Sequence, residues 1–67
     1  MDTSLLEYFM KKKGVSKKDL AECIDVKYNA ICLRLSGKIE FKRSEISKIA
    51  KLLELSKEQV INIFFNL

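Results

Sequence analysis

Apolar residues recur along this chain at the three- and four-residue spacing of amphipathic helices. The first stripe is formed by Leu5, Leu6, Phe9 and Met10, and the last stretch, after residue 59, is apolar nearly all round. Residues three or four apart lie on one helical face, where they can be buried together. Proline is absent and glycine occurs twice, so long stretches are free to form helix. The pattern predicts an all-α chain.

Residues suited to helix ends divide this pattern into five helices. Ser16 and Ser56 each stand three residues before a side chain that can complete a capping box. Gly14 and Gly37 suit the left-handed position at which helices end. The predicted helices run from a cap at 2–4 to about 13, from 17 to 24, from 27 or 28 to 35, across 46–53, and from 57 to about 65. We expect Phe41, between the third and fourth helices, to tuck back into the core.

Length and composition indicate one small folded domain. The chain has 67 residues, of which 48% are hydrophobic and 33% charged, which is enough for one modest core. Its 13 basic residues against 9 acidic ones give a net charge of +4. That charge favours a polyanionic partner, although it does not by itself separate nucleic acid from an anionic membrane surface.

The residues that are missing argue against an enzyme. Histidine is absent, no predicted face carries a carboxylate pair, and there is no glycine-rich phosphate loop. We therefore expect no metal, cofactor or small-molecule substrate. Cys23 and Cys32 do not form a disulfide scaffold, and we interpret them as small packing residues in preference to a redox switch. The chain shows neither a signal peptide nor a bilayer-length apolar run, so we expect a cytoplasmic protein without a membrane partner.

The segment 16–38 has the features of a helix-turn-helix. Two helices that cross at a steep angle need a small residue where their backbones approach, and a residue that tolerates left-handed geometry in the turn. Ala21 and Asp25 stand at those places. Apolar residues must also lock the angle, and they occur at the required offsets, at Leu20, Ile24, Val26 and Ile31. The second helix of this motif, roughly 28–35, would be presented to the major groove of DNA.

A longer pattern carries a resemblance to a known family. It consists of Leu20-Ala21-x-x-Ile24-x-Val26, then Ile31, then Ser36-Gly37-Lys38, and finally Ile46-x-x-Ile49-Ala50-x-x-Leu53-x-Leu55-Ser56. This pattern resembles the Cro/C1-type (XRE-like) helix-turn-helix family of phage and bacterial repressors. The stretch Leu35-Ser36-Gly37-Lys38, Phe41 and Phe64-Phe65 is most similar to short phage or prophage Cro-like repressors of Gram-positive bacteria. The resemblance implies a compact five-helix lambda-repressor-like domain over 1–67 that binds a palindromic operator as a homodimer.

Three residues depart from the family pattern. Asp25 replaces the usual turn glycine, which the left-handed tolerance of aspartate permits. Lys27 replaces a serine or threonine cap, at a cost of about 1 kcal/mol in helix capping. Arg34 stands where many members have an apolar core residue. Its guanidinium would either reach along the groove edge to a phosphate or pair with a glutamate of the first or second helix, such as Glu7.

The start of the third helix supplies the base-reading candidates, which are Tyr28, Asn29, Cys32 and Leu33. The Asn29 amide can pair with adenine N6 and N7, and its alternative is a solvent-facing or helix-start residue. Tyr28 suits a sugar or phosphate contact, and its alternative is packing on the preceding helix. Leu33 suits a thymine methyl group, and its alternative is a core position displaced by Arg34.

Basic residues around this helix are candidates for phosphate contacts, and the set is Lys17, Lys27, Arg34, Lys38, Lys42 and Arg43. The C-terminal apolar residues exceed what one face of a small domain buries, so they either complete the core or form a dimer interface. These dimerisation candidates are Ile63, Phe64, Phe65 and Leu67.

The sequence therefore predicts a sequence-specific double-stranded DNA-binding transcriptional regulator, Cro-like or repressor-like, that is a homodimer at least on DNA. The alternative is a protein-interaction module, such as an antirepressor or adaptor, that keeps this fold without specific DNA binding. In that alternative the chain would dock through its Phe64-Phe65 end.

Overall fold

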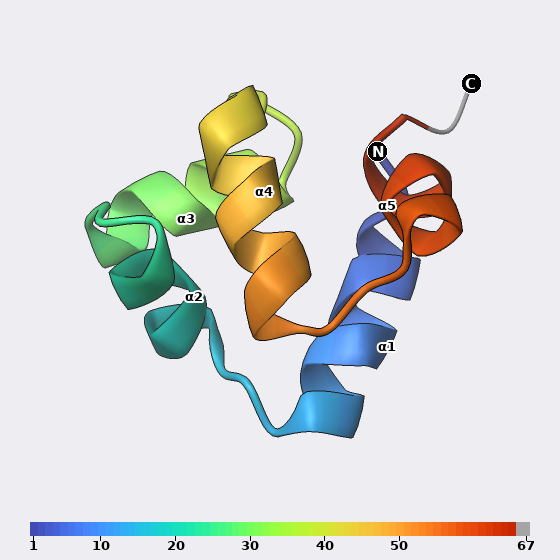
Figure 1. The fold of residues 1–67 in the computed structure, drawn as a ribbon. Helices are drawn as coiled ribbons and strands as arrows, with labels where there is room; N and C mark the ends of the chain where they lie inside the picture. Colours follow the sequence, from blue (N-terminus) through green and yellow to red (C-terminus); the bar gives the residue numbers. More distant parts are fainter. Residues whose placement is uncertain (66–67) are drawn as a thin grey trace.

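The computed structural model describes residues 1–65, and this part of the chain folds into five α-helices (Figure 1). Their bounds are α1 Thr3–Lys13, α2 Lys17–Cys23, α3 Tyr28–Leu35, α4 Arg43–Leu52 and α5 Lys57–Phe64. The all-α prediction and the number and order of helices are confirmed. None of the helices in the described part of the chain has the length and hydrophobicity needed to cross a bilayer.

The predicted helix ends are formed by the residues expected to cap them. Ser16 Oγ accepts the backbone N–H of Asp19 at 3.1 Å, and the Asp19 carboxylate accepts the N–H of Ser16 at 2.9 Å. Ser56 and Gln59 make the same reciprocal pair at the start of α5. Gly14 ends α1 with φ at 68°, in the left-handed region that glycine adopts without strain. Local side-chain chemistry thus sets most of the helix boundaries.

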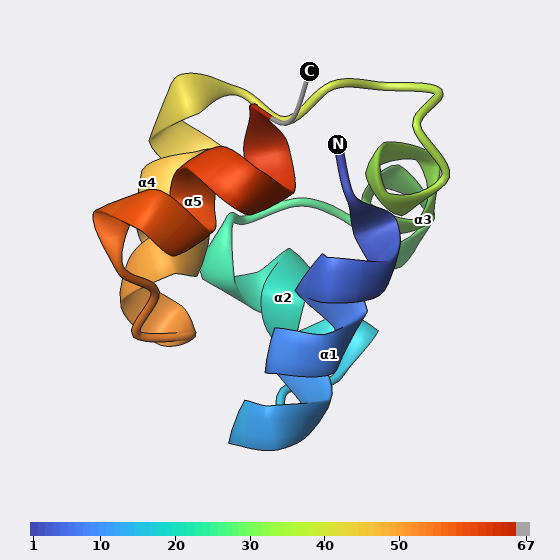
Figure 2. The same ribbon diagram turned by 90° about the vertical axis from the view of Figure 1, so that its right-hand side faces the viewer.

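The helices pack around an aliphatic core to which all five contribute. Figure 1 shows α4 between the α2–α3 pair on one side and α1 with α5 on the other. Figure 2, from the side, shows α1 and α5 lying together at the front. The first residues are tied to the last helix, because the N–H of Asp2 donates to the Ile63 carbonyl at 2.7 Å. The fully buried aliphatic side chains are Leu6, Leu20, Ile31, Ile49, Leu53 and Ile63.

The C-terminal apolar residues divide between core and surface. Ile63 is fully buried, so assigning it to a dimer interface was wrong, and its side chain instead completes the core. Phe64 is half-buried and meets Phe41 edge to face, with ring centroids 5.6 Å apart, so the expected return of Phe41 to the core is confirmed. Phe65 is 53% exposed. Leu67, the fourth predicted dimer residue, lies outside the described residues.

The start of α3 offers a test of capping. Lys27 is its N-cap residue with extended backbone geometry, and no side chain accepts a hydrogen bond from the first turn. Replacing Lys27 with serine supplies that acceptor, so Lys27→Ser should raise the free energy of unfolding by about 1 kcal/mol in urea denaturation. Ser16→Ala, which removes an existing cap, should lower it by about the same amount.

Lys38→Ser is the matched control for Lys27→Ser. It removes the same charge from an exposed loop without creating a cap, and should change stability by less than about 0.5 kcal/mol. Equal unfolding midpoints for Lys27→Ser and Lys38→Ser would contradict the capping account.

Candidate nucleic-acid interface

The helix-turn-helix is built by α2, a tight turn and α3. Asp25 takes φ of 57° in this turn, which confirms the expected left-handed geometry. The N–H of Val26 then donates to the carbonyl of Ala21 at 3.0 Å, bringing the chain back across the end of α2. Leu20 on α2 and Ile31 on α3 are fully buried between the two helices and the rest of the core. This packing holds α3 at the surface with one side free.

The free side of α3 carries the four base-reading candidates. Tyr28 is 53% exposed and Leu33 39% exposed, Asn29 is exposed, and Cys32 is half-buried. Tyr28 and Leu33 therefore lie at the surface, and the alternatives that placed them in packed positions do not describe this structure. Residues 29, 32, 33 and 36 are spaced three and four apart, on one helical face. Along it runs a shallow hollow of about 490 Å³ lined by Asn29, Cys32, Leu33, Ser36 and Lys38.

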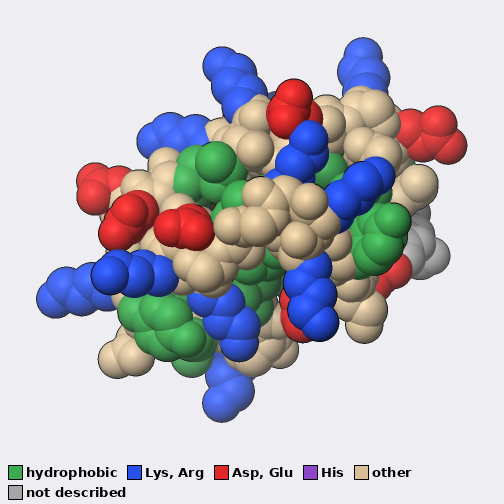
Figure 3. All heavy atoms as spheres, turned by 90° about the horizontal axis from the view of Figure 1, so that it is seen from below, with side chains coloured by type: hydrophobic (Ala, Val, Ile, Leu, Met, Phe, Trp, Pro, Cys, Tyr) green, Lys and Arg blue, Asp and Glu red, His purple; other side chains and the backbone are tan. Residues whose placement is uncertain are grey.

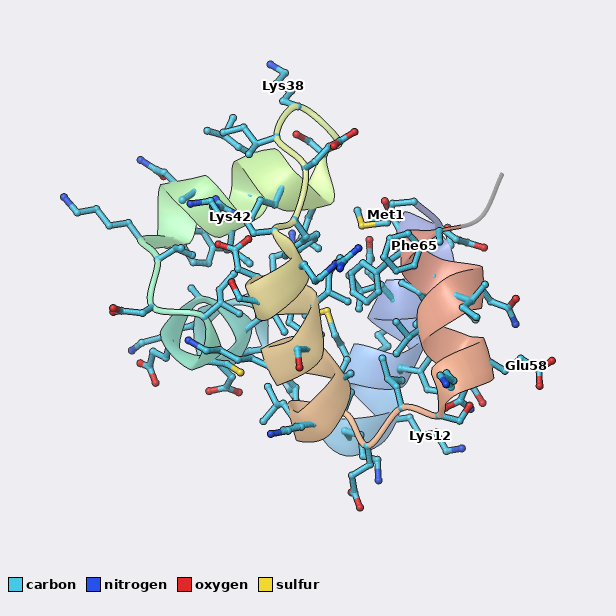
Figure 4. All side chains as sticks on the ribbon, turned by 45° about the horizontal axis from the view of Figure 1, so that its top comes forward. Met1, Lys12, Lys38, Lys42, Glu58 and Phe65 are labelled. Carbon is cyan, nitrogen blue, oxygen red and sulfur yellow. The ribbon has the colours of Figure 1, made fainter. Side chains whose placement is uncertain are left out.

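Exposed cations stand on α2, on α4 and on the segments next to α3 in the chain. They stand at the first turn of α2, just before α3, in the α3–α4 loop and at the start of α4, and they are Lys17, Lys27, Lys38, Lys42 and Arg43. Within the described residues none of the five forms an ion pair, so their charges are available to an anion. Figure 4 shows Lys38 at the tip of the α3–α4 loop, whereas Lys12 lies at the opposite end of the molecule.

Charge alone does not single out the α3 face. Figure 3 shows Lys and Arg side chains spread over the face of the molecule that is seen from below, interrupted by acidic side chains. What distinguishes the α3 face is that it exposes amide, hydroxyl and apolar side chains next to Lys38. Cations that contact phosphates position a protein on DNA, whereas amide, hydroxyl and apolar side chains read the edges of the bases.

Arg34 lies inside the protein, where it pairs with Glu45 of α4. Its Nε–H and Nη2–H donate to the two Glu45 carboxylate oxygens at 3.0 and 3.1 Å, and Nη1–H donates to the Ala30 carbonyl at 3.2 Å. Arg34 is 8% exposed and Glu45 6%. Glu7 is therefore the wrong partner, since the glutamate comes from the fourth helix, and the engaged guanidinium of Arg34 is not free to contact phosphate.

Glu45 is the residue near this site that the sequence analysis missed. Its carboxylate also accepts the backbone N–H of Lys42 at 2.9 Å, so it caps α4 while it pairs with Arg34. A signal was present, because Glu45 stands four residues before Ile49 and thus on the inward face of its helix. A buried arginine requires such a carboxylate nearby.

Two carboxylates near this site are held in their charged form. Burial by itself raises the pKa of Glu45, but the hydrogen bonds from Arg34 and the Lys42 N–H, together with both positive charges, outweigh it and lower the pKa. The Ser16 N–H, and then the Ser16 hydroxyl, lower the pKa of the exposed Asp19. The start of α2 and the α3–α4 junction therefore both keep an ionised carboxylate at neutral pH.

The two cysteines are free thiols in half-buried positions. Cys23 Sγ donates to the Lys48 carbonyl at 3.7 Å, and Cys32 lines the hollow on α3. Both side chains also pack against the core, as expected of small packing residues.

A comparison with protein families identifies the family of this chain. The model of the Cro/C1-type HTH DNA-binding domain matches residues 6–65, a range that contains α2 to α5 and most of α1. Neither a curated protein nor a solved structure gives a significant match.

The lowered pKa of Glu45 predicts loss of stability in acid. Below the ordinary glutamate pKa of about 4.3, the unfolded chain binds this proton more readily than the folded chain. The contribution of Glu45 is therefore complete above that pH and is lost as pH falls through the lower folded-state value. Urea unfolding between pH 7 and pH 3 should show a decline that is shallower in Glu45→Gln. Parallel declines in the two proteins would contradict this assignment.

Proposed function

Because the chain belongs to the Cro/C1-type helix-turn-helix DNA-binding domains, we propose that it binds specific double-stranded sites as a Cro-like or repressor-like transcriptional regulator. The observation that carries this proposal is the free face of α3, which exposes Asn29 and Leu33 beside Lys38, on a chain whose neighbouring elements carry further cations that form no ion pair within residues 1–65. In the proposed complex this face enters the major groove, and the cations contact the phosphates on either side.

The proposed base contacts divide into one amide and several apolar or aromatic groups. Asn29, the second residue of α3, pairs with adenine through its amide oxygen and nitrogen. Cys32 and Leu33 line the hollow next to it and take the methyl group of a neighbouring thymine. Tyr28, at the first position of α3, contacts sugar or phosphate. Since Asn29 is the one amide in this set, DNA shape supplies part of the specificity.

The proposed phosphate contacts are Lys17, Lys27, Lys38, Lys42 and Arg43. Each is exposed, and Lys17 and Arg43 stand at the first positions of α2 and α4, where helix dipoles also favour an anion. Because Arg34 is engaged with Glu45, it is not included. These contacts supply affinity for any duplex and make that affinity fall with salt.

We further propose that the protein binds a palindromic site as a homodimer. Exposed Phe65 lies beside Met1, as Figure 4 shows, and both line a hollow of about 310 Å³. Ile39, Phe41 and Phe64 supply most of its other apolar lining, and Arg34 and Glu40 supply polar groups. Ile61, on the same helix as Phe64, is also exposed. Apolar surface of this kind on a small protein suits a self-complementary contact. Two copies of α3 would then reach half-sites about 34 Å apart.

Selection from a random duplex pool tests the function directly. The wild-type protein should enrich a duplex with two related half-sites, and should bind it about 10³-fold or more tightly than a scrambled duplex of the same composition at moderate salt. Electrophoretic mobility shift and fluorescence anisotropy measure both affinities. If no selected duplex outcompetes the scrambled one, the regulator proposal fails, and a protein-interaction module on this fold becomes the better description.

Two substitutions separate base reading from phosphate contact. Asn29→Ala should cost about 1–3 kcal/mol on the selected duplex and little on the scrambled one. Lys17→Ala should weaken binding to both and reduce the slope of affinity against salt by about one. Equal losses on the two duplexes for Asn29→Ala would make Asn29 a positioning contact instead.

Matched controls come from the far side of the molecule. Asn62→Ala removes an exposed asparagine of α5, and Lys12→Ala removes a lysine at the far end of α1 (Figure 4). Asn62→Ala should leave both affinities unchanged, and Lys12→Ala should change the salt slope by less than Lys17→Ala does.

A further inference from the structure

The Arg34–Glu45 pair joins the two elements that carry the proposed DNA contacts. Arg34 lies in the last turn of α3, and Glu45 is the third residue of α4. Glu45 Oε1 accepts both the Nε–H of Arg34 and the backbone N–H of Lys42, and Oε2 accepts the Nη2–H of Arg34. One buried carboxylate therefore holds the end of the reading helix and the start of the helix that carries Lys42 and Arg43.

Besides the shared aliphatic core, the Arg34–Glu45 pair is the ion pair that links α3 to α4 within residues 1–65. The backbone of α2 packs closely against both helices, but the backbones of α3 and α4 make little direct contact with each other. The loop between them spans 36–42. The N–H groups of Lys38 and Ile39 donate back to the Leu33 carbonyl of α3, whereas the Lys42 carbonyl accepts the N–H of Ile46 and so belongs to the start of α4. The ion pair is thus a direct side-chain link across this junction.

Stability alone is a weak reason for such a pair. Removing two charges from water is costly, and well-packed apolar residues in their place are often as stable or more stable. An apolar pair, however, can slide and rotate, whereas a guanidinium that donates two parallel hydrogen bonds to a carboxylate fixes distance and orientation together. The distinct contribution of the pair is geometric.

We propose that Arg34 and Glu45 are positioning residues for DNA recognition. Their bidentate pair holds the base-reading face of α3 in register with the phosphate-contacting start of α4. Asn29 and Leu33 then meet base edges while Lys42 and Arg43 contact the backbone of the same half-site. Neither Arg34 nor Glu45 touches DNA in this arrangement. The inference rests on the proposed function, since it assigns a task to the pair within that complex.

The double variant Arg34→Met/Glu45→Leu separates positioning from stability. It replaces the pair by apolar side chains and keeps the net charge of +4, so the long-range attraction to DNA is preserved. It should stay folded and unfold at a somewhat lower urea concentration than wild type, because apolar replacement of a buried pair is often neutral but the Lys42 N–H loses its acceptor. Its affinity for a scrambled duplex should be unchanged, and its preference for the duplex selected by wild type should fall by roughly tenfold or more.

The second ion pair of the described chain provides a matched control. Lys13 and Glu54 meet at 2.6 Å on the exposed surface, between the end of α1 and the turn before α5. Lys13→Met/Glu54→Gln also removes one charge of each sign, and should leave the preference for the selected duplex at its wild-type value. A loss there as large as in Arg34→Met/Glu45→Leu would overturn the proposal, because the effect would not belong to the α3–α4 junction.

The single variants Arg34→Lys and Glu45→Gln test the same positioning role if the double variant does not fold. Arg34→Lys retains the charge and loses the planar fork, and should lower the preference for the selected duplex. Glu45→Gln retains one acceptor for Arg34 and Lys42, and should lower that preference less than Arg34→Lys does. Wild-type preference in folded Arg34→Met/Glu45→Leu or in Arg34→Lys overturns the positioning role and leaves the proposed function standing. A wild-type protein that selects no duplex overturns both.

Discussion

The packing of α2 against both α3 and α4 is the contact on which the exposed face of α3 depends. Leu20, Ile31 and Ile49, one from each of these helices, are fully buried in the shared core. Truncating a buried aliphatic side chain to alanine typically costs 2–5 kcal/mol, which is a large part of the 5–15 kcal/mol that holds a small protein folded. The same few side chains that stabilise this chain therefore also determine how α3 is presented.

Local chemistry explains why so short a chain reaches that packing. The capping boxes at Ser16 and Ser56 and the left-handed residues at Gly14 and Asp25 stop and restart the helices at defined points. Helices of seven to eleven residues are marginal alone, so the caps and the core must act together. Agreement between local signals and tertiary packing is what makes one fold much more stable than its competitors.

The same agreement explains how far the fold could be predicted from sequence. Most helix ends were predictable within about one residue, because each depends on side chains a few positions away; the predicted end at 24 is the C-cap Ile24 itself. The start of α4 was not, since the apolar stripe begins at Ile46 whereas the helix begins at Arg43, where the Glu45 carboxylate caps it. The outward position of Leu33 followed from helical spacing. The partner of Arg34 could not be predicted from helical spacing, because an ion pair between residues 11 apart in the sequence depends on how two helices are placed. Ile63 was misassigned for a related reason: an all-apolar helix does not reveal which of its faces meets the core.

The composition of the α3 face bears on how such a protein could be selective. A single good bidentate base contact is worth about 1–3 kcal/mol, and Asn29 is the one amide among the proposed readers. Against roughly 10⁶–10⁹ competing sites in a genome, one half-site read in this way discriminates too little. Two linked half-sites add their discrimination, because the second binding event becomes intramolecular. Under the proposed function, selective binding therefore depends on two copies acting together, and the proposed contact at the exposed Phe65 end matters to specificity as much as the proposed reading helix.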